Sequence, residues 1–98
     1  MMKKVRFEWD GKKDLANLRN HGVPFDESRP VFYDDNAIEF FDQEHSLKED
    51  RFLMIGLSGK MRILLVSYTV MERKDEEVIR IISSRKATKN EQEFYFKR

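Results

Sequence analysis

The sequence predicts an α+β fold: a strand and helices at the N-terminal end, then an antiparallel four-stranded meander, then a C-terminal helix. Two observations support this fold class. The spacing of hydrophobic residues changes from helical to alternating near Asn36, and turn-forming residues divide the alternating part into short strands. With 98 residues and neither a linker nor a repeat, the chain is expected to form one domain over residues 1–98.

The first predicted elements are a strand over residues 5–9 and the helix that follows it. Hydrophobic and charged residues alternate in the strand, as they do in a half-buried β-strand. Asp10 is a suitable N-cap for the helix, and Leu15 and Leu18 share one of its faces at i,i+3 spacing. Gly22 is placed to end the helix in a left-handed conformation.

A short second helix is expected over residues 25–33. Its predicted cap is Asp26, and three hydrophobic side chains would be buried along it: Phe25, Val31 and Phe32. Pro30 lies inside this segment, lacks an amide proton and disfavours helical angles in the residue before it. We therefore expect a broken turn or a helix confined to the first residues.

Four strands and a last helix make up the rest of the predicted chain. The strands span residues 37–42, 51–57, 61–69 and 78–83. Residues 58–60 are typical of a tight hairpin turn, whereas 43–50 and 71–77 are expected to be longer polar loops. Thr88 followed by Glu91 is a capping box, which predicts a helix over 88–96.

Composition and charge limit the possible functions. The chain has no cysteine, which excludes disulfides, thiolate metal sites and cysteine nucleophiles. Its start lacks an apolar leader and its apolar runs are too short to cross a bilayer, so we expect a soluble, cytoplasmic protein that does not bind membranes. Residues 1–20 carry a charge of +3, 34–50 carry −6 and 80–98 carry +4. The two basic segments could converge on one anion-binding face, or the charges could be scattered over the surface.

Three basic residues lie in and just after the last predicted strand: Arg80, Arg85 and Lys86, within the segment RIISSRKAT. Guanidinium groups there, next to the free N–H groups of a helix N-terminus, could hold a phosphodiester. The alternatives are an ion pair between Arg80 and the acidic segment, and a solvated pair formed by Arg85 and Lys86.

Other candidates lie in the meander and its loops. Arg62 begins the longest predicted strand, and Arg51 begins the strand before it. Tyr68 has the side-chain parity of apolar neighbours, so a core tyrosine is the commoner outcome and a catalytic tyrosine the alternative. His45, in a polar loop, could transfer protons near neutral pH or be an exposed residue without a role. His21 is better explained by capping the end of the first helix.

The residue pattern gives no support to several chemistries. The two histidines are 24 positions apart without a paired ligand motif, so we expect no bound metal. No glycine-rich phosphate loop or nucleophile elbow is present, and we expect no cofactor. What remains is metal-free chemistry on an anion, such as RNA cleavage by attack of a 2′-hydroxyl on the adjacent phosphorus. Arginine is a poor general base, so a histidine, tyrosine, carboxylate or water would move the proton.

Four segments, in order and at these separations, carry a resemblance to a known family. They are FEWDGKKDLANLRNHGVPF (7–25), VFYDDNAIEF (31–40), DQEHSLKEDRFLMIGLS (42–58) and RIISSRKATKNEQEFY (80–95). Together they cover nearly the whole chain and resemble the BrnT toxins of type II toxin–antitoxin systems. The resemblance implies a RelE-like fold and an endoribonuclease that cleaves messenger RNA and inhibits translation.

The same resemblance implies partners and site positions. The expected partner is a BrnA-like antitoxin with a ribbon-helix-helix DNA-binding region, in a complex of two toxins and two antitoxins that reaches operator DNA only through the antitoxin. The family pattern matches the following residues: Arg51, His21, and Arg80, Ser83 and Arg85 of RIIS-x-R. Pro24 and Pro30 depart from the helix-friendly residues usual in the second helix.

The expected mechanism places guanidinium groups from distant parts of the chain on one exposed surface. Arg80 and Arg85 would clamp the scissile phosphate, while Arg51 or Arg62 would stabilise the transition state. Tyr68 or His45 would assist proton transfer, and three lysines would hold neighbouring phosphates: Lys12, Lys13 and Lys86. The alternatives are a module that binds RNA or the ribosome without cutting, and a structural partner of a DNA-binding repressor.

Overall fold

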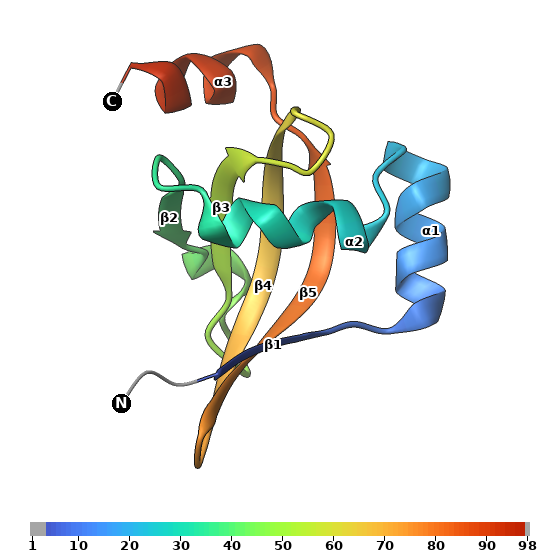
Figure 1. Ribbon diagram of the computed structural model, residues 1–98, viewed down its shortest axis with the longest axis vertical. Helices are drawn as coiled ribbons and strands as arrows, with labels where there is room; N and C mark the ends of the chain where they lie inside the picture. Colours follow the sequence, from blue (N-terminus) through green and yellow to red (C-terminus); the bar gives the residue numbers. More distant parts are fainter. Residues whose placement is uncertain (1–3, 98) are drawn as a thin grey trace.

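Five strands form a single sheet in the computed structural model, which describes residues 4–97 (Figure 1). The strands are β1 (Lys4–Glu8), β2 (Ile38–Phe41), β3 (Phe52–Leu57), β4 (Ile63–Arg73) and β5 (Glu76–Lys86), and their order across the sheet is β1-β5-β4-β3-β2. The last four form the predicted antiparallel meander, whereas β1 joins the edge of the sheet parallel to β5. The predicted α+β fold class is confirmed.

The helix α1 (Gly11–His21) begins and ends where its capping residues predict. The Asp10 carboxylate accepts the backbone N–H groups of Lys12 and Lys13, at 2.8 and 3.2 Å. At the other end, Gly22 has a φ of 70° and donates its N–H to the carbonyl oxygen of Leu18 at 2.8 Å. A left-handed conformation of this kind is easily adopted by glycine, so both predicted ends are confirmed.

A polar residue docks α1 against the sheet. β1 pairs only with residues 76–80 of β5, so the remaining edge of β5 has no neighbouring strand among the described residues. Asn17 pairs with this edge: its Nδ2 donates to the Ser84 carbonyl oxygen at 2.7 Å and its Oδ1 accepts the Ser84 N–H at 3.1 Å. The leucine face of α1 points to solvent instead, with Leu15 63% and Leu18 46% exposed.

The second helical segment is broken near Pro30, as predicted. It consists of α2 (Phe25–Ser28) followed by the 3₁₀ helix η1 (Arg29–Tyr33). The predicted cap Asp26 is wrong, because α2 begins one residue before it. The carboxylate of Asp14, on α1, accepts the N–H of Phe25 at 2.8 Å, so the first free donor of α2 is satisfied from the neighbouring helix.

The β4–β5 hairpin is longer than predicted. The expected loop over 71–77 is wrong, because β4 continues to Arg73 and β5 begins at Glu76, with only a two-residue turn between them. This part of the hairpin extends past the helices (Figure 1), and its residues on both faces are mostly polar. Hydrophobic alternation, the signal that identifies a half-buried strand, is therefore missing there.

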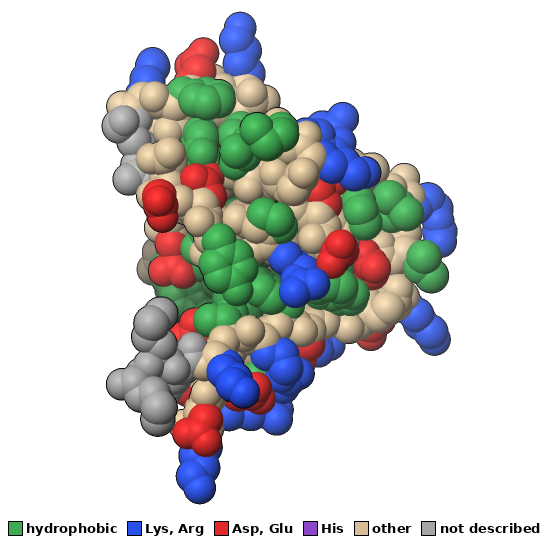
Figure 2. Space-filling view, in the orientation of Figure 1, with side chains coloured by type: hydrophobic (Ala, Val, Ile, Leu, Met, Phe, Trp, Pro, Cys, Tyr) green, Lys and Arg blue, Asp and Glu red, His purple; other side chains and the backbone are tan. Residues whose placement is uncertain are grey.

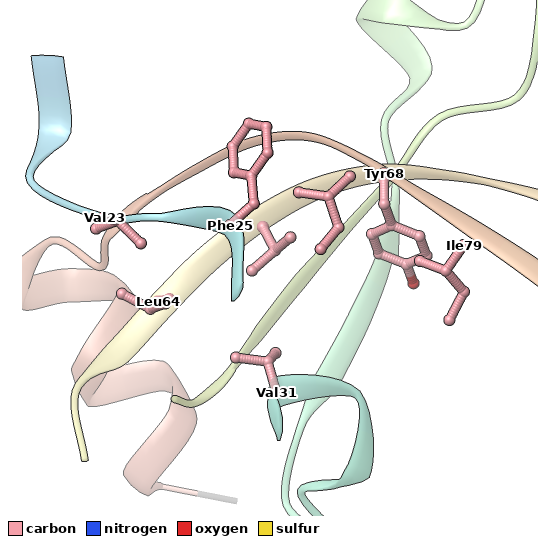
Figure 3. Packing of buried hydrophobic residues seen from close by; sticks show 8 residues of the cluster. Val23, Phe25, Val31, Leu64, Tyr68 and Ile79 are labelled. Carbon is pink, nitrogen blue, oxygen red and sulfur yellow. The ribbon is translucent and has the colours of Figure 1, made fainter. Parts of the chain in front are cut away.

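Hydrophobic residues pack on both faces of the sheet. On one face, α2, η1 and the segment that follows α1 cover a core that contains these fully buried residues among others: Val23, Phe25, Val31, Leu64 and Tyr68 (Figure 3). On the opposite face, α3 (Lys89–Phe96) packs Tyr95 against Ile55, Ile63 and Ala87. The predicted capping box of α3, formed by Thr88 and Glu91, is confirmed. Figure 2 shows the outside of the first face, where hydrophobic, basic and acidic side chains are interspersed.

Candidate functional site

The part of the sheet next to α3 is left open by α1, α2 and η1, and we call it the open face. Side chains alternate between the two faces of a strand, so the neighbours of the core residues Leu64 and Val66 point to the other side. In Figure 1, α2 crosses in front of the strands, and the open face is on the far side. The pairing register places three cross-strand pairs on this face: Leu65 with Arg85, Ser67 with Ser83, and Thr69 with Arg80.

Arg85 lies on the open face and is held by a carboxylate. Its Nη1 and Nη2 donate to the two carboxylate oxygens of Glu91 at 2.8 and 3.0 Å, and Nη1 also donates to the Lys86 carbonyl oxygen at 3.2 Å. The hydrogen bond with Glu91 raises the pKa of Arg85, and the same bond lowers the pKa of Glu91. A guanidinium has five N–H donors, and no partner within residues 4–97 takes the Nε hydrogen or the second Nη2 hydrogen. These two donors can bind a second anion.

His21 shares a pocket with Arg85. The pocket has a volume of about 220 Å³, and Ser67 and Ser83 also line it. Residues that carry an imidazole, hydroxyl groups and a guanidinium therefore line one pocket on the open face. The sequence favours a capping role for His21, and its place in this pocket was not predicted. The sequence feature that could have indicated this place is the spacing of His21 from Asn17, because residues four apart lie one above the other on a helix. Since Asn17 bonds to Ser84 of β5, His21 lies near the same strand.

Arg80 lies farther along β5 and is also paired. Its Nη1 is 2.9 Å from the carboxylate of Glu8, the residue beside it on β1, and its side chain is 43% exposed. The carboxylate of Asp10 is close by. Backbone hydrogen bonds from Lys13 and then Lys12 lower the pKa of Asp10, and the charge of Arg80 contributes to the same shift. The N-terminus of α1 thus lies near the Arg80 end of the open face.

Arg51 lies in the same cross-strand row of the open face as Thr69 and Arg80. The N–H of Asp42 donates to the carbonyl oxygen of Arg51 at 2.8 Å, which extends the β2–β3 pairing by one residue. In the same register Arg51 falls opposite Thr69, whose other neighbour is Arg80. The Nε of Arg51 is buried and has no hydrogen-bond partner in the described part of the chain. The Nη groups of Arg51 also have no hydrogen-bond partner within residues 4–97, and because they are not buried they are the donors that an anion from solvent can reach.

His45 stands beside Arg51. It ends the 3₁₀ helix η2 (Gln43–His45), and its Nδ1 is 3.0 Å from the carboxylate of Asp42. The carboxylate is largely buried at 13% exposed, whereas the imidazole is 60% exposed. His45 and Arg51 line one pocket of about 340 Å³. A carboxylate that fixes one ring nitrogen leaves the other nitrogen directed away from it, as proton transfer requires.

Tyr68 is on the opposite side of the sheet from these residues. Its side-chain parity predicts a core tyrosine, and the residue is 1% exposed among the core residues (Figure 3), with its ring 4.8 Å from that of Phe32. Its hydroxyl donates to the carboxylate of Glu39. Burial, together with this hydrogen bond, raises the pKa of Tyr68 far above its ordinary value. The structure thus separates Tyr68 from the candidate arginines, and the hydroxyl keeps its proton.

Arg62 is also apart from the open face. Its Nε donates to the Glu27 carboxylate at 2.9 Å and its Nη2 donates to the Gly22 carbonyl oxygen at 3.1 Å. The Glu27 side chain is only 2% exposed, and the hydroxyl of Ser58 donates to it at 2.7 Å. Burial would raise the pKa of Glu27, but the bonds from Arg62 and Ser58 hold it below its ordinary value. These contacts join the β3–β4 turn to α2, which is a structural role for Arg62.

The three candidate lysines lie at different places. Lys12 and Lys13 are exposed on the first turn of α1, near Arg80. Lys86 is exposed and pairs with Leu64, so its side chain has the parity of the helix-covered face rather than that of Arg85. Neighbouring residues in the sequence thus belong to opposite faces of the sheet.

Within residues 4–97, no cluster of three or more histidine and carboxylate side chains has the arrangement of a metal site. None of the helices described here has the length and hydrophobicity needed to span a membrane.

Comparisons with known proteins identify the family. The family model described as "Ribonuclease toxin, BrnT, of type II toxin-antitoxin system" matches residues 9–91. Among solved structures, the ribonuclease toxin BrnT of Brucella abortus is similar to this chain with a TM-score of 0.59 and 28% sequence identity, over 91% of this chain and 100% of that one. The search of curated proteins found no match. The family match spans β2, β3, β4 and β5, and this chain therefore belongs to the BrnT family of ribonuclease toxins of type II toxin–antitoxin systems.

Proposed function

We propose that this toxin is a metal-independent endoribonuclease, which cleaves messenger RNA on the open face of its sheet and thereby inhibits translation in the cytoplasm. The observation that carries the proposal is the placement of Arg80, Ser83 and Arg85 of β5 on one face, in line with Arg51. Guanidinium groups with free N–H donors match the non-bridging oxygens of a ribose–phosphate backbone.

The proposed reaction uses only groups of this chain and of the RNA. The ribose 2′-oxygen attacks the adjacent phosphorus, the bond from phosphorus to the 5′-oxygen breaks, and a 2′,3′-cyclic phosphate and a 5′-hydroxyl are formed. A general base takes the proton of the 2′-hydroxyl, and a general acid gives a proton to the leaving 5′-oxygen. The free Nε and Nη2 donors of Arg85 and the Nη donors of Arg51 stabilise the charge that develops on the phosphoryl oxygens.

The ion pairs of the open face are compatible with RNA binding. The pair between Arg80 and Glu8 is partly exposed, and such pairs contribute only about 0–1 kcal/mol, so a phosphate can replace the carboxylate at small cost. Arg85 keeps two donors free while Glu91 holds the other edge of its guanidinium. In this proposal Glu91 orients Arg85 rather than blocking it.

Proton transfer is assigned first to His45. Asp42 fixes its Nδ1, and Arg51 lines the same pocket, so a phosphate held by Arg51 would lie near the free ring nitrogen. His21 is the second candidate, because it lines the pocket of Arg85. Tyr68 is not part of the proposed site, since its buried hydroxyl is on the other side of the sheet.

The proposed partner is a BrnA-like ribbon-helix-helix antitoxin, in a complex of two toxins and two antitoxins that binds operator DNA through the antitoxin. Support comes from the family, whose members are toxins of type II toxin–antitoxin systems. Expression of this chain alone should arrest growth, and co-expression of the antitoxin should restore it. Normal growth in the absence of antitoxin would favour the alternative of a purely structural partner.

Cleavage in the presence of EDTA tests the proposed reaction. Purified protein should cut a single-stranded RNA into discrete fragments with 5′-hydroxyl ends, with and without the chelator. His45→Gln should reduce the single-turnover rate by about 100-fold or more, since positioned proton transfer contributes that much. Gln43→Ala, an exposed change in the same 3₁₀ helix, is the control and should cut at the wild-type rate. RNA that is bound but uncut would favour the non-catalytic binding module, and cutting that requires added metal would contradict metal independence.

A further inference from the structure

A third pocket, which is largely apolar, lies on the open face between α3 and the strands β2, β3 and β4. Its volume is about 310 Å³. Its hydrophobic lining includes Phe40, Leu53, Ile55 and Phe94, and the polar residue Asn90 also lines it. Phe94 is 51% exposed even though it belongs to this lining, and its ring centroid is 5.6 Å from that of Phe40. The pocket therefore offers aromatic surface that no residue in the described part of the chain covers completely.

The apolar pocket adjoins the pocket that contains Arg85. Leu53 and Leu65 line both pockets. Glu91, at the rim of the apolar pocket, is the residue that binds Arg85. Across the sheet, β5 and β3 are two strand spacings apart, which is about 10 Å. One nucleotide can thus reach from the guanidinium on β5 to the hydrophobic residues on β3.

We infer that this pocket is a nucleobase subsite, which holds an unstacked base next to the phosphate bound by Arg85. The inference rests on the proposed function, because it requires that the open face binds RNA. Proteins that recognise single-stranded RNA stack its bases on aromatic side chains and read the base edges with hydrogen-bonding groups. Phe94 and Phe40 provide the first kind of contact, and the Asn90 amide provides the second.

The size and polarity of the pocket favour a base over a segment of a partner protein. The pocket is shallow, and its volume of about 310 Å³ is that of a small-molecule site rather than of a groove for a helix or a strand. Its hydrophobic walls are next to a cationic pocket, which is the polarity of a nucleotide: a flat apolar ring joined to an anion. Occupation by a base would fix the position of the neighbouring phosphodiester and so select where the RNA is cut.

Binding of modified oligonucleotides tests the subsite. The probe is a short single-stranded RNA with a 2′-deoxyribose at the cleavage site, which prevents cutting, and with one base removed at each flanking position in turn. For the wild-type protein, loss of one particular base should weaken binding about tenfold or more, as stacking on an aromatic side chain contributes. For Phe94→Ala the intact RNA should bind about tenfold more weakly, and loss of that same base should then have no further effect.

Phe96→Ala is the matched control, because Phe96 is on the same helix and 68% exposed but does not line the pocket. It should bind all the probes as the wild type does. Unchanged binding of every probe by Phe94→Ala would overturn the subsite while leaving the proposed nuclease intact. Unchanged RNA binding together with weaker binding of the antitoxin would overturn it too, and would assign the pocket to the protein partner. If the wild-type protein binds no RNA at all, the proposed function itself is wrong.

Discussion

The buried amide of Asn17 makes a quantitative prediction about stability. The residue is 6% exposed, and its Nδ2 donates to the carbonyl oxygens of Val23 and Ser84, at 2.8 and 2.7 Å. Its Oδ1 accepts the Ser84 N–H at 3.1 Å. Asn17→Ala removes all three bonds and leaves three backbone groups without partners where the chain is almost completely buried.

The expected loss follows from those three groups. A buried polar group left without a hydrogen bond costs about 1–3 kcal/mol. Relaxation of the helix would let water reach part of this edge, so we expect a decrease of about 3 kcal/mol in the free energy of unfolding. Leu18→Ala changes a larger side chain on the next residue, but Leu18 is 46% exposed and should lose no more than about 1 kcal/mol.

Urea unfolding, followed by the fluorescence of Trp9, measures both variants. Trp9 is the one tryptophan of the chain and packs against Phe25 in the core covered by the helices. With the denaturant dependence typical of small proteins, Asn17→Ala should lower the midpoint by about 2 M urea. Equal midpoints for Asn17→Ala and Leu18→Ala would refute the reasoning, because the docking of α1 would then not depend on its polar face.

Three further predictions concern the parts of the fold that support the site. Glu27→Gln should destabilise the protein by about 3 kcal/mol at neutral pH, because the Arg62 ion pair is lost. The pKa of Glu27 lies below its ordinary 4.5, so the ionised carboxylate stabilises the folded protein above that pH, and this contribution is lost on acidification. Urea unfolding at several pH values should therefore show that the free energy of unfolding falls less on acidification for Glu27→Gln than for the wild type. Tyr68→Phe should cleave RNA at the wild-type rate in a gel assay, and a large decrease would contradict its exclusion from the site. Gly56→Ala should lower the melting temperature, since a Cβ there would lie 2.8 Å from Val31. An unchanged melting temperature would contradict this, because Val31 would then have moved aside without loss of stability.

Local signals in the sequence were sufficient for most of the elements. The caps Asp10, Gly22 and Thr88 act within one turn of their own helices, so they are readable without knowledge of the fold. The broken second helix follows from the covalent geometry of Pro30 in the same way. The buried position of Tyr68 also follows from strand parity alone.

Long-range contacts were not predictable from such signals. The parallel pairing of β1 with β5 joins segments about 70 residues apart, and no local pattern specifies it. The ion pair between Arg62 and Glu27 spans 35 positions, which is why Arg62 is a plausible catalytic residue in the sequence and a structural one in the fold. Arg51, Arg80 and Arg85 could be proposed as a group from the sequence, but only the register of the sheet places them on one face.

Two adjacent cationic residues, Arg85 and Lys86, test the central claim most directly, because they lie on opposite faces of the same strand. The measurement is the single-turnover rate of RNA cleavage for Arg85→Gln and Lys86→Gln, which lose the same charge, with folding verified by their unfolding midpoints. An active site on the open face predicts a decrease of about 100-fold or more for Arg85→Gln, since removal of one transition-state donor costs that much, and a change of less than about threefold for Lys86→Gln. Equal effects of the two substitutions, or a larger effect of Lys86→Gln, would contradict a site on the open face.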